Sequence, residues 1–341
     1  MENAAAAVRE QAEDDARFNL YGVGLEVSSS CSMLLDNLAR DFAYFAETPP
    51  AVTVKVTASL CAPPWEKVPQ KFATRVTPNA AIFDEGSVRY NDYRGEALAI
   101  YDFAREEGEV WSENADLLYE ITYLLCLSRV GEIHDRKGIH RVHALGIALA
   151  EKGALVLLPE AGGKSTLCLE LLKHRELRLL SDDTPLVSHR KLYAFPTRIG
   201  VRDGDVTGID PRYLRTMRRR NREPKTLVDF ECFRDRIANE ATPNLVIVGA
   251  RYNGRDSWIE PLSAFGALPA LTSNLVFGLG LPQVVEYFLR SGVSEILRKA
   301  SIVASRSAAA ARLLARARCY RLALGRDIPG AAEAVMTVLR S

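Results

Sequence analysis

A glycine-rich stretch at residues 158–166 carries the residue types that bind nucleotide phosphates, in the order Leu-Pro-Glu-Ala-Gly-Gly-Lys-Ser-Thr. Adjacent glycines let backbone N–H groups close around a phosphate, and the lysine after them can reach β- and γ-phosphate oxygens. The serine hydroxyl can ligate Mg²⁺. The stretch departs from the pattern G-x-x-x-x-G-K-[ST] at one position, where Leu158 replaces the first glycine. It predicts an ATP site with Mg²⁺, whose nucleotide contacts come from Gly162, Gly163, Lys164, Ser165 and Thr166.

Two adjacent carboxylates, Asp182 and Asp183, follow this stretch after one helix and one strand. A phosphoryl transferase needs a carboxylate to hold Mg²⁺, and it gains from a group that accepts the proton of the attacking hydroxyl. Two neighbouring carboxylates can divide these roles. We call residues 158–166 the phosphate loop. We expect the strand that ends at the acidic pair to lie directly beside the strand that leads into this loop, because ligands of open α/β sheets bind at the carboxyl ends of strands.

A basic segment at residues 212–225 holds seven Lys and Arg residues and one acidic residue. Two interpretations stay open for it: a solvated loop, or a surface that steers an acidic peptide or holds nucleotide phosphates. Nucleic-acid binding fits less well, because only Tyr213 offers an aromatic ring for base stacking. Arg198 and Arg202 lie closer in sequence to the acidic pair and are candidates to contact a γ-phosphate.

The segments around the phosphate loop have the patterns of an α/β fold. Residues 154–158 are wholly apolar, as in a strand buried within a sheet, and residues 164–173 have helical periodicity. Residues 177–180 form a second buried strand, which ends at the acidic pair. Further along we expect a hairpin of strands at 244–252 and 257–262 around Asn253-Gly254, a mostly helical segment at 281–317, a strand at 319–324 and a helix from residue 331.

The first part of the chain has a different pattern. Residues 1–16 are rich in Ala and Glu and predict a frayed helix or a tail, so we expect a flexible tail over residues 1–17. Strands are then expected at 21–27, 52–60, 87–93 and 97–103, and helices at 33–45 and 114–130. The sequence therefore predicts an N-terminal α+β module over residues 18–135, followed by a P-loop domain over residues 136–341.

Composition argues against several classes of protein. The 341 residues are 48% hydrophobic and 26% charged, which is typical of globular domains that bury a core without disulfides or metals. A net charge of +1 gives no global field for nucleic acid or a membrane. Six scattered cysteines without a C-x-x-C pair indicate reduced and mostly buried thiols. Because the sequence lacks a signal-peptide pattern and a long apolar run, we expect a cytoplasmic protein without nucleic-acid or membrane partners. The sequence leaves open whether the protein forms a homo-oligomer.

The short spacing between the phosphate loop and the acidic pair resembles the HPr kinase/phosphorylase family, whose P-loop domain is related to that of phosphoenolpyruvate carboxykinase. The matching residues are His143-Ala144, residues 155–158, residues 162–167 and residues 179–183, with weaker similarity at 194–196, 260–263 and 320–322. The N-terminal module vaguely resembles those of HPr-kinase-like proteins of bacterial gene clusters, including lasso-peptide kinases. The resemblance implies an α/β fold in which the P-loop domain has a mixed sheet and C-terminal helices.

The resemblance also implies ATP-dependent phosphorylation of a serine on a protein or peptide acceptor. Carried to this sequence, Lys164 and Ser165 bind phosphate and Mg²⁺. Asp182 is then the base for the acceptor serine, and Asp183 is a partner of the metal. His143 matches a family histidine near the catalytic aspartate, where it would tune that carboxylate.

Alternatives remain at two levels. His140 competes with His143 for the role of the family histidine. For the whole protein, one alternative is a nucleotide-binding regulatory module with weak turnover, an interpretation motivated by Leu158. Another is a small-molecule kinase that phosphorylates free serine or another metabolite hydroxyl.

Overall fold

The computed structural model describes residues 14–47, 49, 51–201, 206, 208–220, 222–279, 281 and 293–341. The chain divides into two compact units, one made of Met1–Ala39 and Phe45–Cys126 and the other of Arg40–Tyr44 and Leu127–Ser341. The boundary predicted at residues 135 and 136 lies at the end of helix α2 (Ala115–Arg136) and stays a prediction. No helix in the described ranges is both long enough and apolar enough to cross a bilayer.

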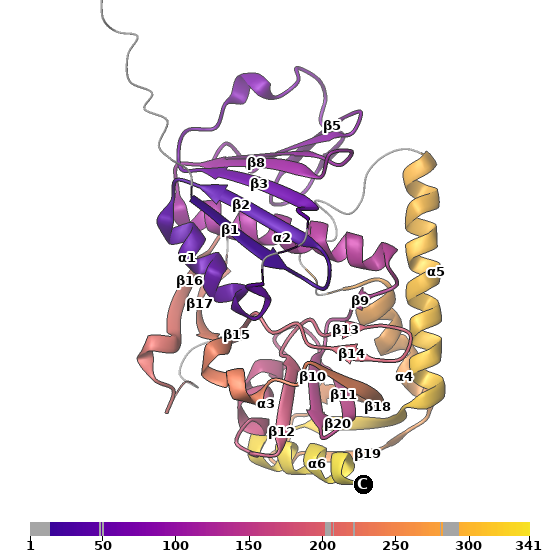
Figure 1. Cartoon of the computed structure of the whole chain (residues 1–341). Helices are drawn as coiled ribbons and strands as arrows, with labels where there is room; N and C mark the ends of the chain where they lie inside the picture. Colours follow the sequence, from indigo (N-terminus) through magenta and orange to yellow (C-terminus); the bar gives the residue numbers. More distant parts are fainter. Residues whose placement is uncertain are drawn as a thin grey trace, which may run out of the picture. The chain divides into compact units, whose positions relative to one another are not determined.

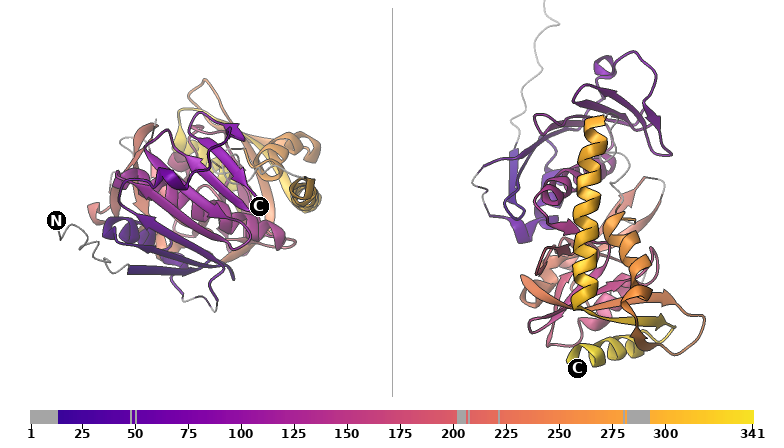
Figure 2. Two further views of the ribbon diagram at one scale, coloured as in Figure 1. Left: turned by 90° about the horizontal axis from the view of Figure 1, so that it is seen from above. Right: turned by 90° about the vertical axis from the view of Figure 1, so that its right-hand side faces the viewer.

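The first unit is built on a sheet whose described strands run in the order β1-β2-β3-β8-β7-β6-β5-β4 (Figure 1). Seen from above in Figure 2, these strands form one continuous twisted sheet. β2, β3 and β8 are parallel neighbours, and the other pairs are antiparallel. The strands are β1 (Asp14–Asn19), β2 (Gly24–Ser29), β3 (Val54–Ser59), β4 (Arg75–Val76), β5 (Ala81–Glu85), β6 (Val88–Asp92), β7 (Ala97–Asp102) and β8 (Glu107–Ser112). The helical segments before α2 are α1 (Ser32–Asp41), η1 (Ala43–Phe45) and η2 (Trp65–Lys67).

The sequence patterns of this unit are largely confirmed. The strands expected at 52–60, 87–93 and 97–103 are β3, β6 and β7, and the helix expected at 33–45 is α1. The strand expected at 21–27 starts only at Gly24, because Tyr21 and Gly22 adopt positive φ in a turn. The predicted tail is wrong for residues 14–17, which belong to β1 and pair with β2, where Phe18 is buried. Residues 1–13 of that tail lie outside the described residues.

The second unit centres on a mixed sheet with the described strand order β12-β10-β11-β18-β14-β13-β9, in which β20 pairs with both β18 and β19. β11, the strand before the phosphate loop, is antiparallel to β10 and parallel to β18. A smaller sheet has the order β15-β17-β16. The strands are β9 (His140–Arg141), β10 (Leu145–Leu149), β11 (Lys152–Leu157), β12 (Leu177–Ser181), β13 (Leu186–Val187), β14 (Leu192–Tyr193), β15 (Arg198–Val201), β16 (Leu214–Arg219), β17 (Arg222–Asp229), β18 (Glu240–Arg251), β19 (Trp258–Leu262) and β20 (Arg318–Leu324).

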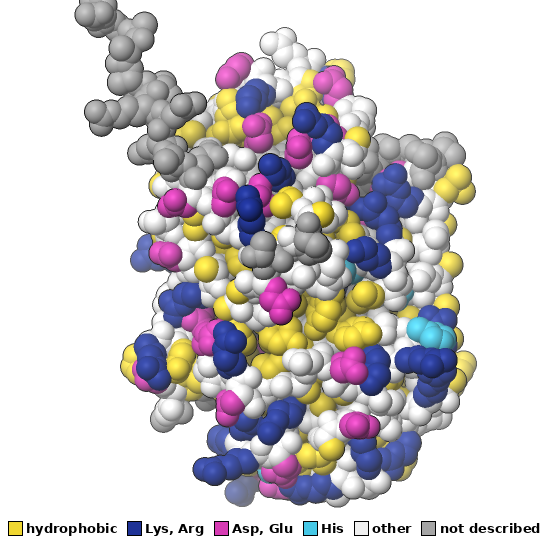
Figure 3. Space-filling view, in the orientation of Figure 1, with side chains coloured by type: hydrophobic (Ala, Val, Ile, Leu, Met, Phe, Trp, Pro, Cys, Tyr) yellow, Lys and Arg dark blue, Asp and Glu magenta, His cyan; other side chains and the backbone are white. Residues whose placement is uncertain are grey.

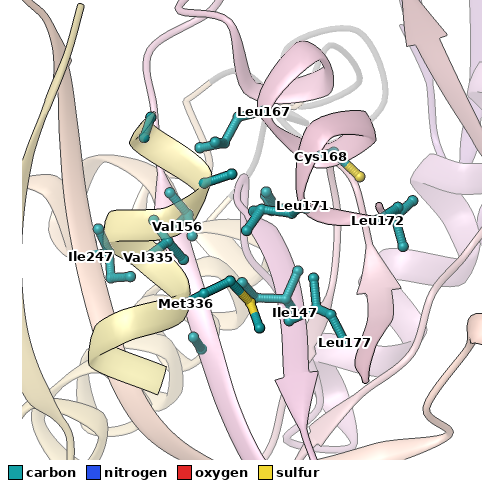
Figure 4. Packing of buried hydrophobic residues seen from close by; sticks show 14 of the residues in the cluster. Ile147, Val156, Leu167, Cys168, Leu171, Leu172, Leu177, Ile247, Val335 and Met336 are labelled. Atoms are coloured by element: carbon teal, nitrogen blue, oxygen red, sulfur yellow. The ribbon is translucent and has the colours of Figure 1, made fainter. Parts of the chain in front are cut away.

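Helices cover both faces of the large sheet. The helical segments are α3 (Lys164–Leu171), η3 (Pro211–Tyr213), η4 (Phe230–Arg236), α4 (Ala264–Leu271), η5 (Thr272–Val276), α5 (Val293–Arg316) and α6 (Ile328–Arg340). On one face, α3 and α6 bury Leu171 and Met336 against Ile147, Val156 and Ile247 of the strands (Figure 4). On the other face, α4, η5 and α5 pack against the sheet. Full burial of one such side chain stabilises by about 1.5–3 kcal/mol. The packing of α3 against the sheet therefore fixes the position of the phosphate loop that precedes it.

Two expectations about strand order are wrong. β12 is not beside β11, because β10 pairs with both and lies between them. β18 and β19 do not form a hairpin, because β20 inserts between them, parallel to β18 and antiparallel to β19. The expected late elements are otherwise confirmed as β20 and α6. Of the helix expected at 281–317, α5 is the described part, and residues 282–292 lie outside the described residues.

The surface and the thiols agree with the composition. Basic and acidic side chains are interspersed over the face in Figure 3, in keeping with the net charge of +1. All six cysteines are free thiols, and four of them (Cys31, Cys126, Cys168 and Cys319) are buried.

Candidate active site

The phosphate loop joins the end of β11 to the start of α3 and needs its glycines. Gly163 is the N-cap of α3 with φ of 93°, a left-handed conformation that favours glycine. The N–H of Gly162 donates to the Pro159 carbonyl at 2.9 Å, and a Cβ on Gly162 would lie 2.8 Å from that oxygen. No side chain of the described residues caps α3. The backbone N–H groups of its first turn are therefore directed at a position that suits an anion.

Leu158, which replaces the first glycine of the motif, belongs to the core and not to the phosphate-binding surface. Its side chain is 1% exposed and packs with the cluster beneath α3. The neighbouring strand β18 carries Gly249 at this point, and a Cβ there would lie 2.5 Å from Leu158 Cδ2. The space for the leucine thus comes from a missing side chain on β18, which leaves the glycines of the loop unaffected.

Three side chains meet at the start of α3. Lys164 Nζ lies 2.8 Å from Asp183 Oδ1, and His143 Nδ1 lies 3.2 Å from the same oxygen. Lys164 Nζ also lies 3.0 Å from His143 Nε2. Burial lowers the pKa of His143, and this favours a neutral ring in which Nδ1–H donates to Asp183 and Nε2 accepts from Lys164. Burial works to raise the pKa of Asp183, but the charge of Lys164 and its hydrogen bond to this carboxylate outweigh it, so that the pKa is lowered.

Backbone hydrogen bonds place His143 beside the acidic pair. The N–H of Val142 donates to the Pro185 carbonyl, and the N–H of Ala144 donates to the Asp183 carbonyl. On its other side, the N–H of His143 donates to the Asn274 carbonyl in the π-helical turn η5. The histidine is therefore held between the segment after β12 and the layer of α4 and η5.

Asp182 faces Ser165, the second residue of α3. Ser165 Oγ donates to Asp182 Oδ2 at 3.0 Å, and Asp182 is 7% exposed. Burial, reinforced by the charge of Asp183, raises the pKa of Asp182 to about 7. The neighbouring carboxylates therefore have pKa values displaced in opposite directions, which is a common property of sites that move protons.

Most of the candidate site residues come together, and one competing residue does not. The first turn of α3 contains Lys164, Ser165 and Thr166. Three further candidate residues lie against this turn: His143, Asp182 and Asp183. His140 has other partners: its Nδ1 lies 2.8 Å from Asp135 Oδ1, and its Nε2 lies 3.0 Å from Ser305 Oγ. These contacts favour His143 over His140.

The arginines have different positions. Arg198 forms an ion pair with Asp41, and Arg202 lies outside the described residues. Sequence reasoning missed Arg251, at the end of β18, whose Nη1 is 3.6 Å from the position of a Cβ on Gly163. β18 is parallel to β11, so both strands end at the same edge of the sheet. Arg251 could have been selected as an arginine at the end of a strand that pairs in parallel with β11. The sequence alone does not show that β18 is this strand.

Comparisons with known proteins give a distant similarity. No family model and no curated protein matches this chain. Among solved structures, the HPr(Ser) kinase/phosphatase from Coxiella burnetii is 21% identical over 33% of this chain and 65% of that chain, with a TM-score of 0.23. The match thus spans slightly less than two thirds of the Coxiella protein. At this identity and TM-score the similarity supports no functional argument, and the roles that follow rest on the residues of this chain.

Proposed function

We propose that the protein is an ATP-dependent phosphotransferase that phosphorylates a serine hydroxyl of a protein or peptide. The observation that carries this proposal is the convergence of Lys164, His143 and Asp183 with the Ser165–Asp182 pair at the start of α3. A glycine turn that only connected a strand to a helix would not need a buried lysine between a histidine and a carboxylate. Phosphoryl transfer needs such groups, because its catalysis rests on positioning and on charge stabilisation.

The contacts of the two aspartates favour a division of roles opposite to the one predicted from the sequence. Asp182 is bonded to Ser165, the hydroxyl expected to ligate the metal, so we assign Asp182 to the support of Mg²⁺. The side chain of Asp183 is 45% exposed and lies beside His143, so an acceptor hydroxyl has access to it. We assign the proton-accepting role to Asp183, with His143 orienting it.

The residues present fit the nucleotide and the metal. Lys164, the N–H groups of the first turn of α3 and Arg251 would hold phosphate oxygens, and Ser165 with Asp182 would hold Mg²⁺. When bound, Mg²⁺ neutralises charge on the phosphates. Enzymes of this kind bind Mg²⁺ through one or two protein ligands together with substrate phosphates and water. A group of three or more His, Cys, Asp or Glu ligands, which the described residues do not contain, is therefore not required.

The first test is Mg·ATP consumption by the wild type and by Lys164→Ala, with serine-containing peptides and with free serine as acceptors. Acceptor-dependent turnover that is lost in Lys164→Ala supports the proposal. Turnover only with free serine would make the protein a small-molecule kinase. ATP binding without turnover on any acceptor would favour the nucleotide-binding regulatory module.

The second test separates the two aspartates. Asp183→Asn should keep the affinity for Mg·ATP and lose about 10²–10⁴ in rate, as expected for a general base. Asp182→Asn should raise the Mg²⁺ concentration needed for half-maximal ATP binding. The opposite pattern would return the two roles to the assignment made from the sequence.

A further inference from the structure

Lys225 lies in the small sheet, on a strand separate from the phosphate loop. It is a residue of β17, where its register partner is Met217 of β16. Met217 is buried, and Lys225 is half-buried on the same face of the sheet. The aliphatic part of this lysine is therefore covered by the fold, unlike the exposed Arg218 next to Met217.

The path of the Lys225 side chain depends on a glycine of the adjacent strand. A Cβ on Gly200 of β15 would lie 2.7 Å from Lys225 Nζ, 3.1 Å from its Cδ and 3.2 Å from its Cε. The lysine thus runs across β15 at the one position of that strand that has no side chain. No ion pair or hydrogen bond joins its ammonium group to another residue within the described ranges, so a cation is held in place without a protein counterion.

The acidic pair of the candidate site lies within electrostatic reach of this ammonium. Burial lowers the pKa of Lys225, and the charges of Asp182 and Asp183 act against that shift. In the other direction, the charge of Lys225 lowers the pKa of Asp182, of Asp183 and of His143. Arg198 and Arg219 are the like charges near Lys225, and both act to lower its pKa.

The charges of the site need a second cation once nucleotide is bound. In the structure Lys164 neutralises Asp183 at 2.8 Å. The proposed function has Lys164 bind phosphate oxygens, and this takes its charge away from the acidic pair. His143 has a lowered pKa and does not replace that charge. Lys225, on β17, is a cation whose charge acts on both carboxylates.

We propose that Lys225 contacts the phosphoryl group on the acceptor side of the site and stabilises its charge during transfer. The inference rests on the proposed phosphotransferase function. In the step, the acceptor oxygen forms a bond to the γ-phosphorus, the bond from that phosphorus to the β–γ bridging oxygen breaks, and ADP leaves with that electron pair. The acceptor proton goes to Asp183. Lys225 stays protonated throughout, so it is neither an acid nor a base.

The test measures single-turnover transfer from γ-labelled Mg·ATP to a serine peptide that the wild type accepts. Lys225→Gln should lower the rate of transfer by about 10²–10³, as for the loss of one donor to a developing charge, and change the Kd of ATP by less than about threefold. Lys225→Arg should recover part of the rate. Gly200→Ala should lower the rate by a smaller factor, because the added Cβ displaces a lysine that is still present. The matched control is Lys191→Gln, which removes an exposed lysine paired with Glu240 at 2.9 Å.

A role in folding alone would give a different result. Such a role would lower ATP affinity and the rate of transfer together, whereas the proposed contact lowers the rate of transfer and leaves the Kd of ATP nearly unchanged. Thermal unfolding shows whether each variant is folded, and Lys225→Arg decides if the glutamine variant is not. The inference is overturned if folded Lys225→Gln transfers phosphate at the wild-type rate, or if it loses ATP affinity and rate equally. The proposed function is unaffected by either result as long as turnover is lost in Lys164→Ala. ATP binding without wild-type transfer overturns both.

Discussion

The contact between Leu158 and Gly249 can be tested by a pair of substitutions. Gly249→Ala would place a Cβ 2.5 Å from Leu158 Cδ2, a separation that buried carbons do not adopt. Overfilling a packed core in this way costs about 1–3 kcal/mol. Leu158→Ala removes a side chain that is 1% exposed, and such a change costs about 2–5 kcal/mol. Because the alanine at 158 vacates the space that the new Cβ needs, the double variant should be more stable than the sum predicts, by about 0.5–3 kcal/mol.

Urea denaturation of the four proteins gives this coupling free energy directly. ATP binding should stay close to that of the wild type in Gly249→Ala, because the glycines of the phosphate loop are not in this contact. A control is provided by Gly86→Ala, at a position where nothing lies within 4 Å of an added Cβ and the only cost is the positive φ of 59°. Additive effects of Gly249→Ala and Leu158→Ala would refute the account of how the fold accommodates a leucine in place of the first glycine.

Three further predictions concern charged groups. Asp182 has a pKa raised to about 7, so the native protein keeps a proton that the unfolded chain releases near pH 4. The free energy of unfolding should therefore fall as the pH rises from about 4 to about 7. Asp182→Asn should abolish that fall, which urea denaturation at pH 5 and pH 8 would measure; an unchanged pH dependence would contradict the raised pKa. Arg251→Gln should raise the Kd of ATP by about tenfold with no change in thermal unfolding, because Arg251 lies beside Gly163 on the exposed side of the loop; unchanged titration calorimetry would remove it from the site. Asp41→Asn should destabilise by about 3–5 kcal/mol, because Asp41 is buried and its loss leaves the guanidinium groups of Arg198 and Arg215 without this carboxylate; unaffected denaturation would show that these ion pairs are not formed.

The parts of the site that follow one another in the chain were predictable from the sequence. Gly163 and Lys164 signal a phosphate loop because backbone conformation and charge are local properties of those residues. Asp182 and Asp183 could be assigned to the same edge because a strand of buried residues precedes them. That conclusion survives although β10 separates β12 from β11: β12 and β11 are both antiparallel to β10, so they run in the same direction and end at one edge.

The contributions from distant parts of the chain could not be predicted in the same way. Arg251 is placed by the parallel pairing of β18 with β11, and Lys225 by the pairing of β17 with β15 and β16. Pairing partners depend on which faces bury apolar residues together in three dimensions, and a single sequence does not state this. The Asn253-Gly254 turn misled for the same reason, because its local preference for a hairpin does not exclude a third strand between β18 and β19.

The choice between the two histidines illustrates how the fold converts a sequence pattern into chemistry. His140 and His143 are separated by two residues and have the same intrinsic chemistry. His140 is taken up by Asp135 and Ser305, whereas the backbone bonds from Val142 and Ala144 carry His143 to the acidic pair. His143 is buried enough to stay neutral beside Lys164, so it can orient Asp183 without competing with the lysine for charge. The proposed role of Lys225 adds a second lysine, from β17, whose charge acts on the same carboxylates.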